Sequence, residues 1–153
     1  MHPRYFHYCI FFAGSLICVA ALGKLASSMG SAHVLQYPDP IFQIPFRQMF
    51  WLVGTVELAI AVVCLFGRRI ALQACLVAWL ATAFAAYRLG LLWVGYEKPC
   101  SCLGNLTDAL HIPAQTADTA MKIILAYLLI CSYATLLWIW RQGKAASHTT
   151  CVI

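Results

Sequence analysis

Four long apolar runs, at about residues 8–26, 49–66, 70–94 and 117–140, constrain the fold of this chain more than any other feature. Each run is about 18 residues or longer, which is the length that an α-helix needs to cross a bilayer. The chain has 153 residues, of which 63% are hydrophobic and only 10% charged, so a soluble domain would lack polar residues for its surface. We therefore expect an all-α fold: an integral membrane four-helix bundle, forming one domain over residues 1–153 and embedded in lipid.

Several other classes of protein are disfavoured by the same sequence. It contains no alternating strand pattern, no glycine-rich phosphate loop and no internal repeat. The net charge of +5 is modest and scattered along the chain, which is typical of membrane topology and not of a nucleic-acid-binding surface. No cofactor motif is evident, and nothing in the sequence sets an oligomeric state.

Basic residues predict how the chain is oriented in the membrane. Four spans place both termini and the short turn at residues 67–69 on one side. The basic residues on that side are Arg4, Arg68, Arg69, Arg141 and Lys144. By the positive-inside rule we expect this side, including the N- and C-termini, to be cytoplasmic in a multi-pass protein of a bacterial inner membrane. The loops 27–48 and 95–116 would then face the periplasm.

Two cysteines stand one residue apart in the second of these loops, within Pro99-Cys100-Ser101-Cys102-Leu103-Gly104-Asn105. A disulfide between such close cysteines departs from relaxed geometry, and strained or exposed disulfides are the labile, catalytic ones. Lys98 is near enough to favour the thiolate, which is the reacting form of cysteine. We predict that Cys100 and Cys102 form a redox or thiol-exchange centre in an oxidising compartment.

Other interpretations of the cysteines are a structural disulfide that pinches the loop and a metal site. Two thiolates with His111 make an incomplete tetrahedral set, and nothing in the spacing requires His33 as a fourth ligand, so we expect no metal centre. Another five cysteines fall inside the apolar runs, where cysteine behaves as a small hydrophobic residue. We expect these to serve packing: Cys9, Cys18, Cys64, Cys75 and Cys131.

Charged residues within the apolar runs form a second candidate site, an intramembrane polar cluster. Glu57 lies roughly 12 Å and Arg88 roughly 9 Å below the outer ends of their helices, at 1.5 Å per residue. We expect an ion pair between them, because an unpaired charge at this depth is costly, with the shallower Lys24 as a candidate third member. Such a pair fixes helix register, or it lines a polar pocket under the Cys-x-Cys loop for a quinone, a proton path or a small substrate.

A family resemblance is carried by Gly23-Lys24-Leu25, Glu57, Gly67-Arg68-Arg69 and Cys100-Ser101-Cys102-Leu103-Gly104. Together these residues resemble the MauE/DoxX group of small four-helix membrane proteins. The nearer match is the methylamine-utilisation, or MauE, branch, whose members carry a Cys-Gly-Cys-Phe-Gly-like motif before the last helix. The resemblance implies a redox-associated protein that helps to mature a disulfide-rich periplasmic dehydrogenase subunit. It places the redox role on Cys100 and Cys102 alone.

We therefore predict thiol–disulfide exchange or electron transfer at the periplasmic face, in support of an exported redox or disulfide-containing partner. Whether this makes the chain an oxidoreductase or an accessory factor is left open. One alternative is a non-catalytic membrane scaffold with a structural disulfide. Another is a quinone-linked thiol oxidoreductase similar to vitamin K epoxide reductase, although residues 27–48 lack the cysteines through which that design usually relays electrons.

Overall fold

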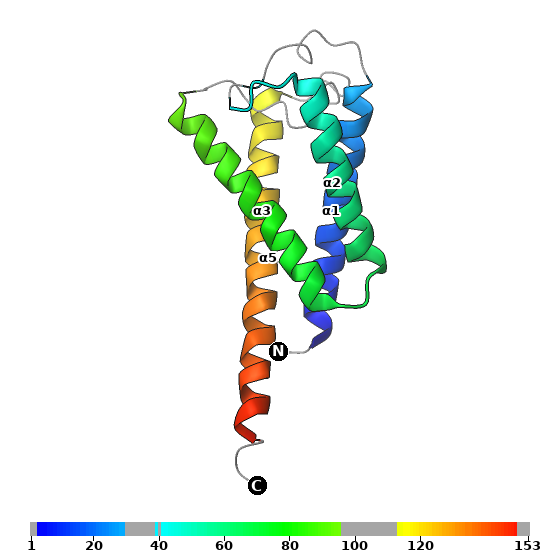
Figure 1. The fold of residues 1–153 in the computed structure, drawn as a ribbon, viewed down its shortest axis with the longest axis vertical. Coiled ribbons are helices and arrows are strands. Elements are labelled where there is room, and N and C mark those ends of the chain that lie inside the picture. The colour runs from blue at the N-terminus through cyan, green and yellow to red at the C-terminus, as the bar shows by residue number, and fades with distance from the viewer. Residues whose placement is uncertain (1–2, 30–38, 40, 96–112, 150–153) are drawn as a thin grey trace.

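The computed structural model describes residues 3–29, 39, 41–95 and 113–149. These parts of the chain form helices and no strand (Figure 1): α1 (Pro3–Ser28), α2 (Phe46–Phe66), α3 (Ile70–Trp93) and α5 (Ala114–Thr149). Within these parts, four helices are long and apolar enough to cross a membrane. The all-α, multi-pass membrane fold expected from the sequence is confirmed.

The helices extend beyond the apolar runs, mainly at α1 and α5. Helix α1 begins at Pro3, a residue whose fixed φ suits the first helical turn. Helix α2 begins directly after Pro45, and α5 continues to Thr149. This last extension contains good helix formers such as Gln142, Lys144 and two alanines, so the helix continues beyond its hydrophobic part.

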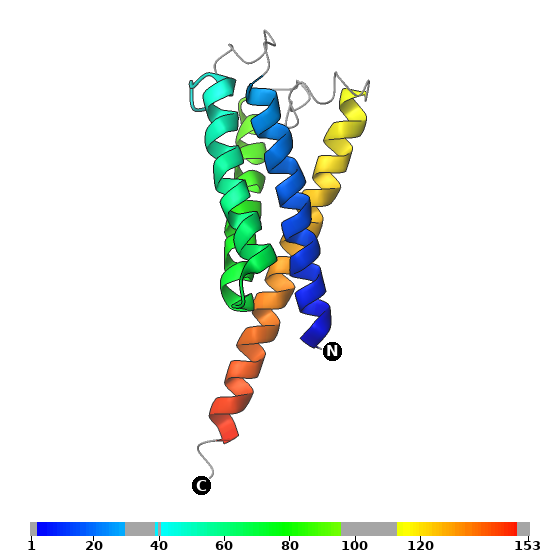
Figure 2. The ribbon, with the colours of Figure 1, turned by 90° about the vertical axis from the view of Figure 1, so that its right-hand side faces the viewer.

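The four helices form two antiparallel pairs. Helix α1 packs most extensively on α2, and α3 packs most extensively on α5. Helices α1 and α3 terminate, and α2 and α5 begin, on the same side of the bundle, which we call the loop end. The opposite end, where α1 begins, α5 ends and the 67–69 turn joins α2 to α3, is the turn end (Figure 2). In Figure 1, α3 is tilted relative to α2, so that the two helices diverge toward the loop end.

The half of the bundle near the turn end holds most of its tightly packed core. A methyl group added to Gly14 would lie 2.7 Å from Cβ of Cys64, so glycine is required for α1 to approach α2 this closely. The side-chain amide of Gln73 donates to the carbonyl oxygens of Cys64 and Gly67 at 3.2 and 2.9 Å, which closes the end of α2. The buried cluster comprises Ile10, Ala13, Ile17, Ile60, Ala61, Cys64, Ala74, Val77, Leu80, Ala81, Leu128 and Cys131.

Two further contacts join α1 to α5 in this half. The rings of Phe6 and Trp138 stack with their centroids 4.7 Å apart. Cys9 and Cys131 are paired as a disulfide, with Cα atoms 6.3 Å apart. Cys131 belongs to the buried hydrophobic cluster and Cys9 packs against it, so both serve packing as expected, and their pairing is a feature that the sequence did not predict. Cys18, Cys64 and Cys75 are free thiols.

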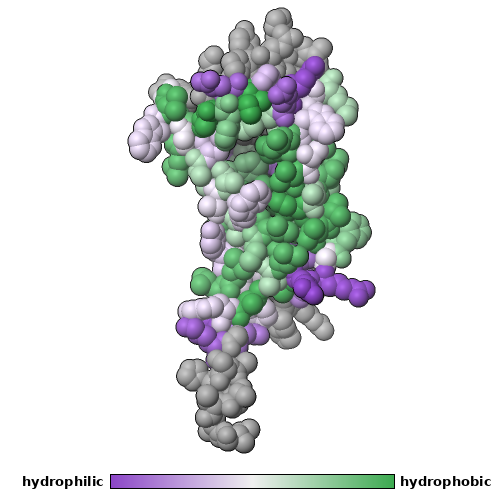
Figure 3. Space-filling view, viewed as in Figure 1, coloured by the Kyte–Doolittle hydropathy of each residue, from purple (hydrophilic) through white to green (hydrophobic). Residues whose placement is uncertain are grey.

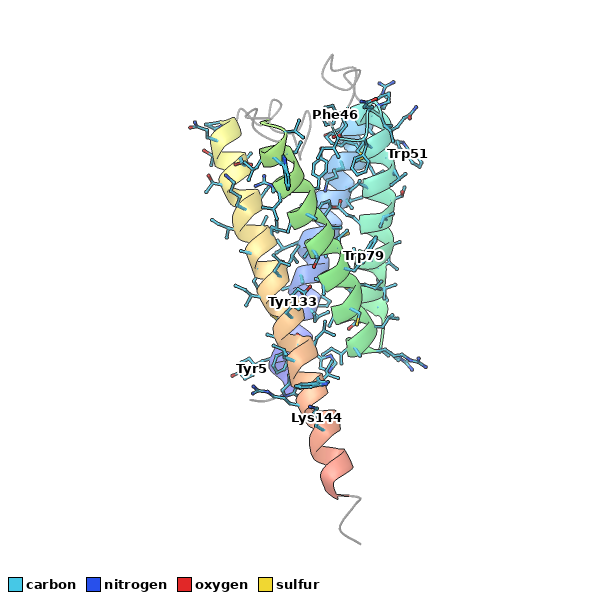
Figure 4. The ribbon with its side chains drawn as sticks, turned by 60° about the vertical axis from the view of Figure 1, so that its left-hand side comes forward. Tyr5, Phe46, Trp51, Trp79, Tyr133 and Lys144 are labelled. Atoms are coloured by element: carbon cyan, nitrogen blue, oxygen red, sulfur yellow. A yellow bond between two sulfur atoms is a disulfide. The ribbon has the colours of Figure 1, made fainter. Side chains whose placement is uncertain are left out.

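Aromatic and basic side chains mark both ends of the hydrophobic band. Phe46 and Trp51 lie toward the loop end, and Tyr5 and Lys144 lie toward the turn end (Figure 4). The Lys144 ammonium is 3.9 Å from the centroid of the Trp140 ring. Between these ends the surface in view is mainly hydrophobic (Figure 3), which is the pattern of a chain seated in a bilayer.

Candidate functional site

The predicted exchange centre, Cys100 and Cys102, lies outside the described residues. Helix α3 ends at Trp93 and α5 begins at Ala114, both at the loop end. The described part of the chain therefore contributes the helices on either side of the motif and the polar groups within them.

Lys24 of α1 and Glu57 of α2 form an ion pair inside the bundle. The Lys24 ammonium lies 2.5 and 2.7 Å from the two carboxylate oxygens, and both side chains are almost fully buried, at 6% and 3% exposed. The same ammonium is 5.2 Å from the centroid of the Phe84 ring on α3. Each charge is thus compensated at close range, which a low-dielectric environment requires.

Arg88 takes a different partner from the one that the sequence suggested. Its guanidinium bonds to Asp118 of α5, and the expected Glu57–Arg88 pair does not form. Lys122, one turn further along α5, contacts the other oxygen of Asp118 at 2.7 Å. The reason lies in the packing, because α3 lies against α5 and Lys24 reaches Glu57 directly from α1.

Asp39 is a polar residue that sequence reasoning missed as part of the site. It is 1% exposed, and one carboxylate oxygen accepts hydrogen bonds from the backbone N–H groups of Ile41 and Phe42, at 2.8 and 2.9 Å. The other oxygen accepts from the hydroxyl of Tyr87 on α3, and the Tyr87 ring stacks on Phe42 at 6.1 Å. The aspartate therefore attaches the segment before α2 to α3. The available sequence signal was a short polar side chain among turn residues, typical of an Asx turn.

A cavity of about 510 Å³ lies in the loop-end half of the bundle, beside several of these polar groups. All four helices contribute to its lining, as does the segment that leads into α2. Lys24, Glu57 and Arg88, the three residues of the predicted polar cluster, all line this cavity. The structure therefore brings the three to one cavity, although only Lys24 and Glu57 contact each other as a pair.

The described residues contain no group of three or more His, Cys, Asp or Glu side chains arranged to hold a metal ion. Near the turn end, the Tyr127 hydroxyl donates to the Cys9 carbonyl oxygen at 3.1 Å and lies 3.4 Å from the Cys9 sulfur. The Cys9–Cys131 pair lies in and against the packed core, and neither cysteine is among the residues that line the cavity.

Comparison with known proteins adds one finding. A family model described as methylamine utilisation protein MauE matches residues 3–141, which covers all but the two ends of the chain. No curated protein and no solved structure matches the chain.

Proposed function

This chain belongs to the MauE family of methylamine utilisation proteins, and from that premise we propose that it exchanges disulfides with an exported partner through Cys100 and Cys102. In this proposal the bundle is a membrane-embedded maturation factor for a redox protein that contains disulfides. Cys100 and Cys102 carry the chemistry, and the helices hold them at one face of a bacterial inner membrane.

The exchange needs only the two cysteines and a disulfide on the partner. One thiolate attacks a sulfur of the partner disulfide, forms a mixed disulfide and releases a partner thiolate, which takes up a proton. The neighbouring cysteine then loses its proton and attacks the mixed disulfide, which closes the Cys100–Cys102 bond and releases the second partner thiolate. The partner is reduced by two electrons and the motif is oxidised by two; the reverse sequence oxidises a partner dithiol.

The observation that carries this proposal is the family match, because it spans the Cys-x-Cys motif as well as the helices. Exposed basic residues at the turn end, Arg68, Arg69 and Arg141, support a cytoplasmic location for that end. With that orientation the loop end faces the periplasm, where a disulfide persists.

Trapping tests the proposal. In Cys100→Ser and Cys102→Ser single variants, one of the two should accumulate a mixed disulfide with an exported protein, visible on a non-reducing gel and lost on reduction. Cys75→Ser is the matched control, because Cys75 is an exposed free thiol on α3 far along the helix from the motif. Its pattern should equal that of the unmodified protein.

Two results would overturn the proposal. The first is full maturation of the partner in a Cys100→Ser/Cys102→Ser double variant, which would favour a scaffold role. The second is labelling of the motif by an impermeant thiol reagent only after the cells are permeabilised, which would place it on the cytoplasmic side.

A further inference from the structure

The loop-end cavity has the size and lining of a binding site for a lipid-soluble molecule. Its volume of about 510 Å³ falls in the range of pockets that enclose small organic ligands. The lining is mainly aliphatic and aromatic, and four of its rings come from Phe42, Phe46, Phe50 and Phe84. Such a surface favours a flat, apolar ring system over a sugar, a nucleotide or a peptide.

The charges in the cavity favour a neutral ligand. Lys24 is compensated by Glu57, and Arg88 is compensated by Asp118, so each charged side chain that lines the cavity has a counter-ion. Asp118 also contacts Lys122, which is 64% exposed and is not among the lining residues. A charged ligand would bring an uncompensated charge into a low-dielectric space, at a large cost in free energy. A neutral ligand avoids this cost.

The cavity also presents a hydrogen-bond donor. An ammonium group has three N–H donors, and within the described residues the hydrogen bonds of Lys24 go to the two oxygens of Glu57. One N–H thus remains for an acceptor on a ligand. A carbonyl oxygen attached to a ring would fit this donor while the ring contacts Phe84, which already lies against the ammonium.

The cavity opens sideways toward lipid. Leu52 of α2 and Trp79 of α3 both line it, and 63% and 60% of their respective surfaces are exposed. At the loop end it is covered by the segment that Asp39 attaches to α3, with Phe42 stacked on Tyr87. The view in Figure 3 looks onto this face between α2 and α3, where the surface is largely hydrophobic. A ligand would therefore enter from the bilayer and could keep an apolar tail there.

From these observations we propose that the cavity binds a neutral, lipid-soluble ring that carries carbonyl groups, the chemistry of a quinone. The ring lies among the phenylalanines, one carbonyl accepts a hydrogen bond from Lys24, and the tail leaves between Leu52 and Trp79. The binding stands on the cavity alone. A role in turnover rests on the proposed function: the dithiol loses two electrons and two protons to form its S–S bond, and the quinone takes up both to become a quinol.

Binding can be measured on the purified full-length protein in detergent with decylubiquinone as the probe. Quinones quench tryptophan fluorescence, and Trp79 lines the cavity. We expect saturable quenching by decylubiquinone. Decylbenzene, which has a similar ring and tail but no carbonyls, should compete for the site with an affinity at least about tenfold lower. A Trp79→Leu variant keeps four of the five tryptophans and should lose most of the saturable quenching.

Two exposed alanines of α3 provide a matched pair of variants. Ala83 lines the cavity, whereas Ala86, three residues further along the same helix, does not. Ala83→Phe should therefore weaken decylubiquinone binding at least about tenfold, and Ala86→Phe should leave it within about twofold of the unmodified protein. Equal quenching in both variants, or equal competition by decylbenzene, would overturn the proposal.

The same measurement separates this inference from the proposed function. A Cys100→Ser/Cys102→Ser variant should bind decylubiquinone with unchanged affinity, because the contacts proposed for the ring, the carbonyl and the tail come from the phenylalanines, Lys24, Leu52 and Trp79. Loss of saturable binding in a protein that still traps its partner would refute the cavity site alone. Saturable binding without any trapped partner would refute the exchange role alone.

Discussion

The two halves of this bundle are built differently. Near the turn end, α1 and α2 approach so closely that Gly14 has no room for a methyl group, and small and aliphatic side chains fill the space between helices. Near the loop end, α3 leans away from α2, a cavity of about 510 Å³ remains, and polar side chains join the helices in pairs. Most of the buried apolar cluster lies in one half, whereas the ion pairs among the described residues lie in the other.

This difference indicates that the two halves have different roles, one in holding the helices together and the other in enclosing the cavity. Close packing holds four helices together where nothing has to enter, since in lipid dispersion contacts between small residues drive association. Ion pairs such as Lys24–Glu57 and Arg88–Asp118 join the helices around a space that the side chains leave open. The half that contains the cavity is also the half from which the Cys-x-Cys loop departs.

The largest expected effect comes from breaking the buried pair in the loop-end half. Glu57→Leu leaves the Lys24 ammonium buried without a partner, and we expect a loss of about 3–5 kcal/mol in the free energy of unfolding. Unfolding by added SDS in mixed micelles, followed by circular dichroism, measures this change.

The double variant Lys24→Leu/Glu57→Leu is the control for that experiment. Replacing a buried ion pair by apolar residues is often neutral, so most of the lost stability should return. If the double variant is as unstable as Glu57→Leu, the pair contributes more than charge compensation and the comparison of the two halves has to be revised.

A smaller effect is expected from adding one methyl group to each half. Gly14→Ala should cost about 1–3 kcal/mol, because the new Cβ would lie 2.7 Å from Cβ of Cys64, an atom fixed to the backbone of α2. Gly90→Ala is its counterpart near the loop end, where the new Cβ would lie 3.1 Å from the flexible tip of Ile41.

For Gly90→Ala we expect no loss, or a gain of up to about 1 kcal/mol, because alanine favours helix over glycine. The same SDS titration compares the two variants directly. Equal destabilisation by both would show that the two halves are packed with similar tightness.

The smallest effect should follow from Asp118→Asn at the loop end. The carboxylate is 20% exposed and contacts Arg88 and Lys122, of which Lys122 is 64% exposed. Its removal should cost about 1 kcal/mol or less, and less still at high salt, because water and ions screen such pairs. Unfolding titrations at low and high sodium chloride measure this, and a loss as large as that of Glu57→Leu would mean that the pair is effectively buried.

The sequence by itself determined the class of the fold and the positions of the helices. Hydrophobic length is a local property, so four runs of sufficient length predict four spans whatever their neighbours are. The terminal boundaries were less predictable, because polar helix formers extend α5 to Thr149 beyond its apolar part. The Cys-x-Cys motif was likewise readable from residue order alone.

Only the tertiary structure decided which charges meet and where a cavity remains. Counting residues along a helix predicts depth in the membrane, and on that basis Glu57 and Arg88 were suitable partners. Depth does not specify which helices lie side by side or how far α3 tilts, and these choices pair Glu57 with Lys24 and Arg88 with Asp118. The same tilt separates α3 from α2 and leaves the cavity that Asp39 and Tyr87 cover, because side-chain contacts between helices are a property of their packing and not of any one helix.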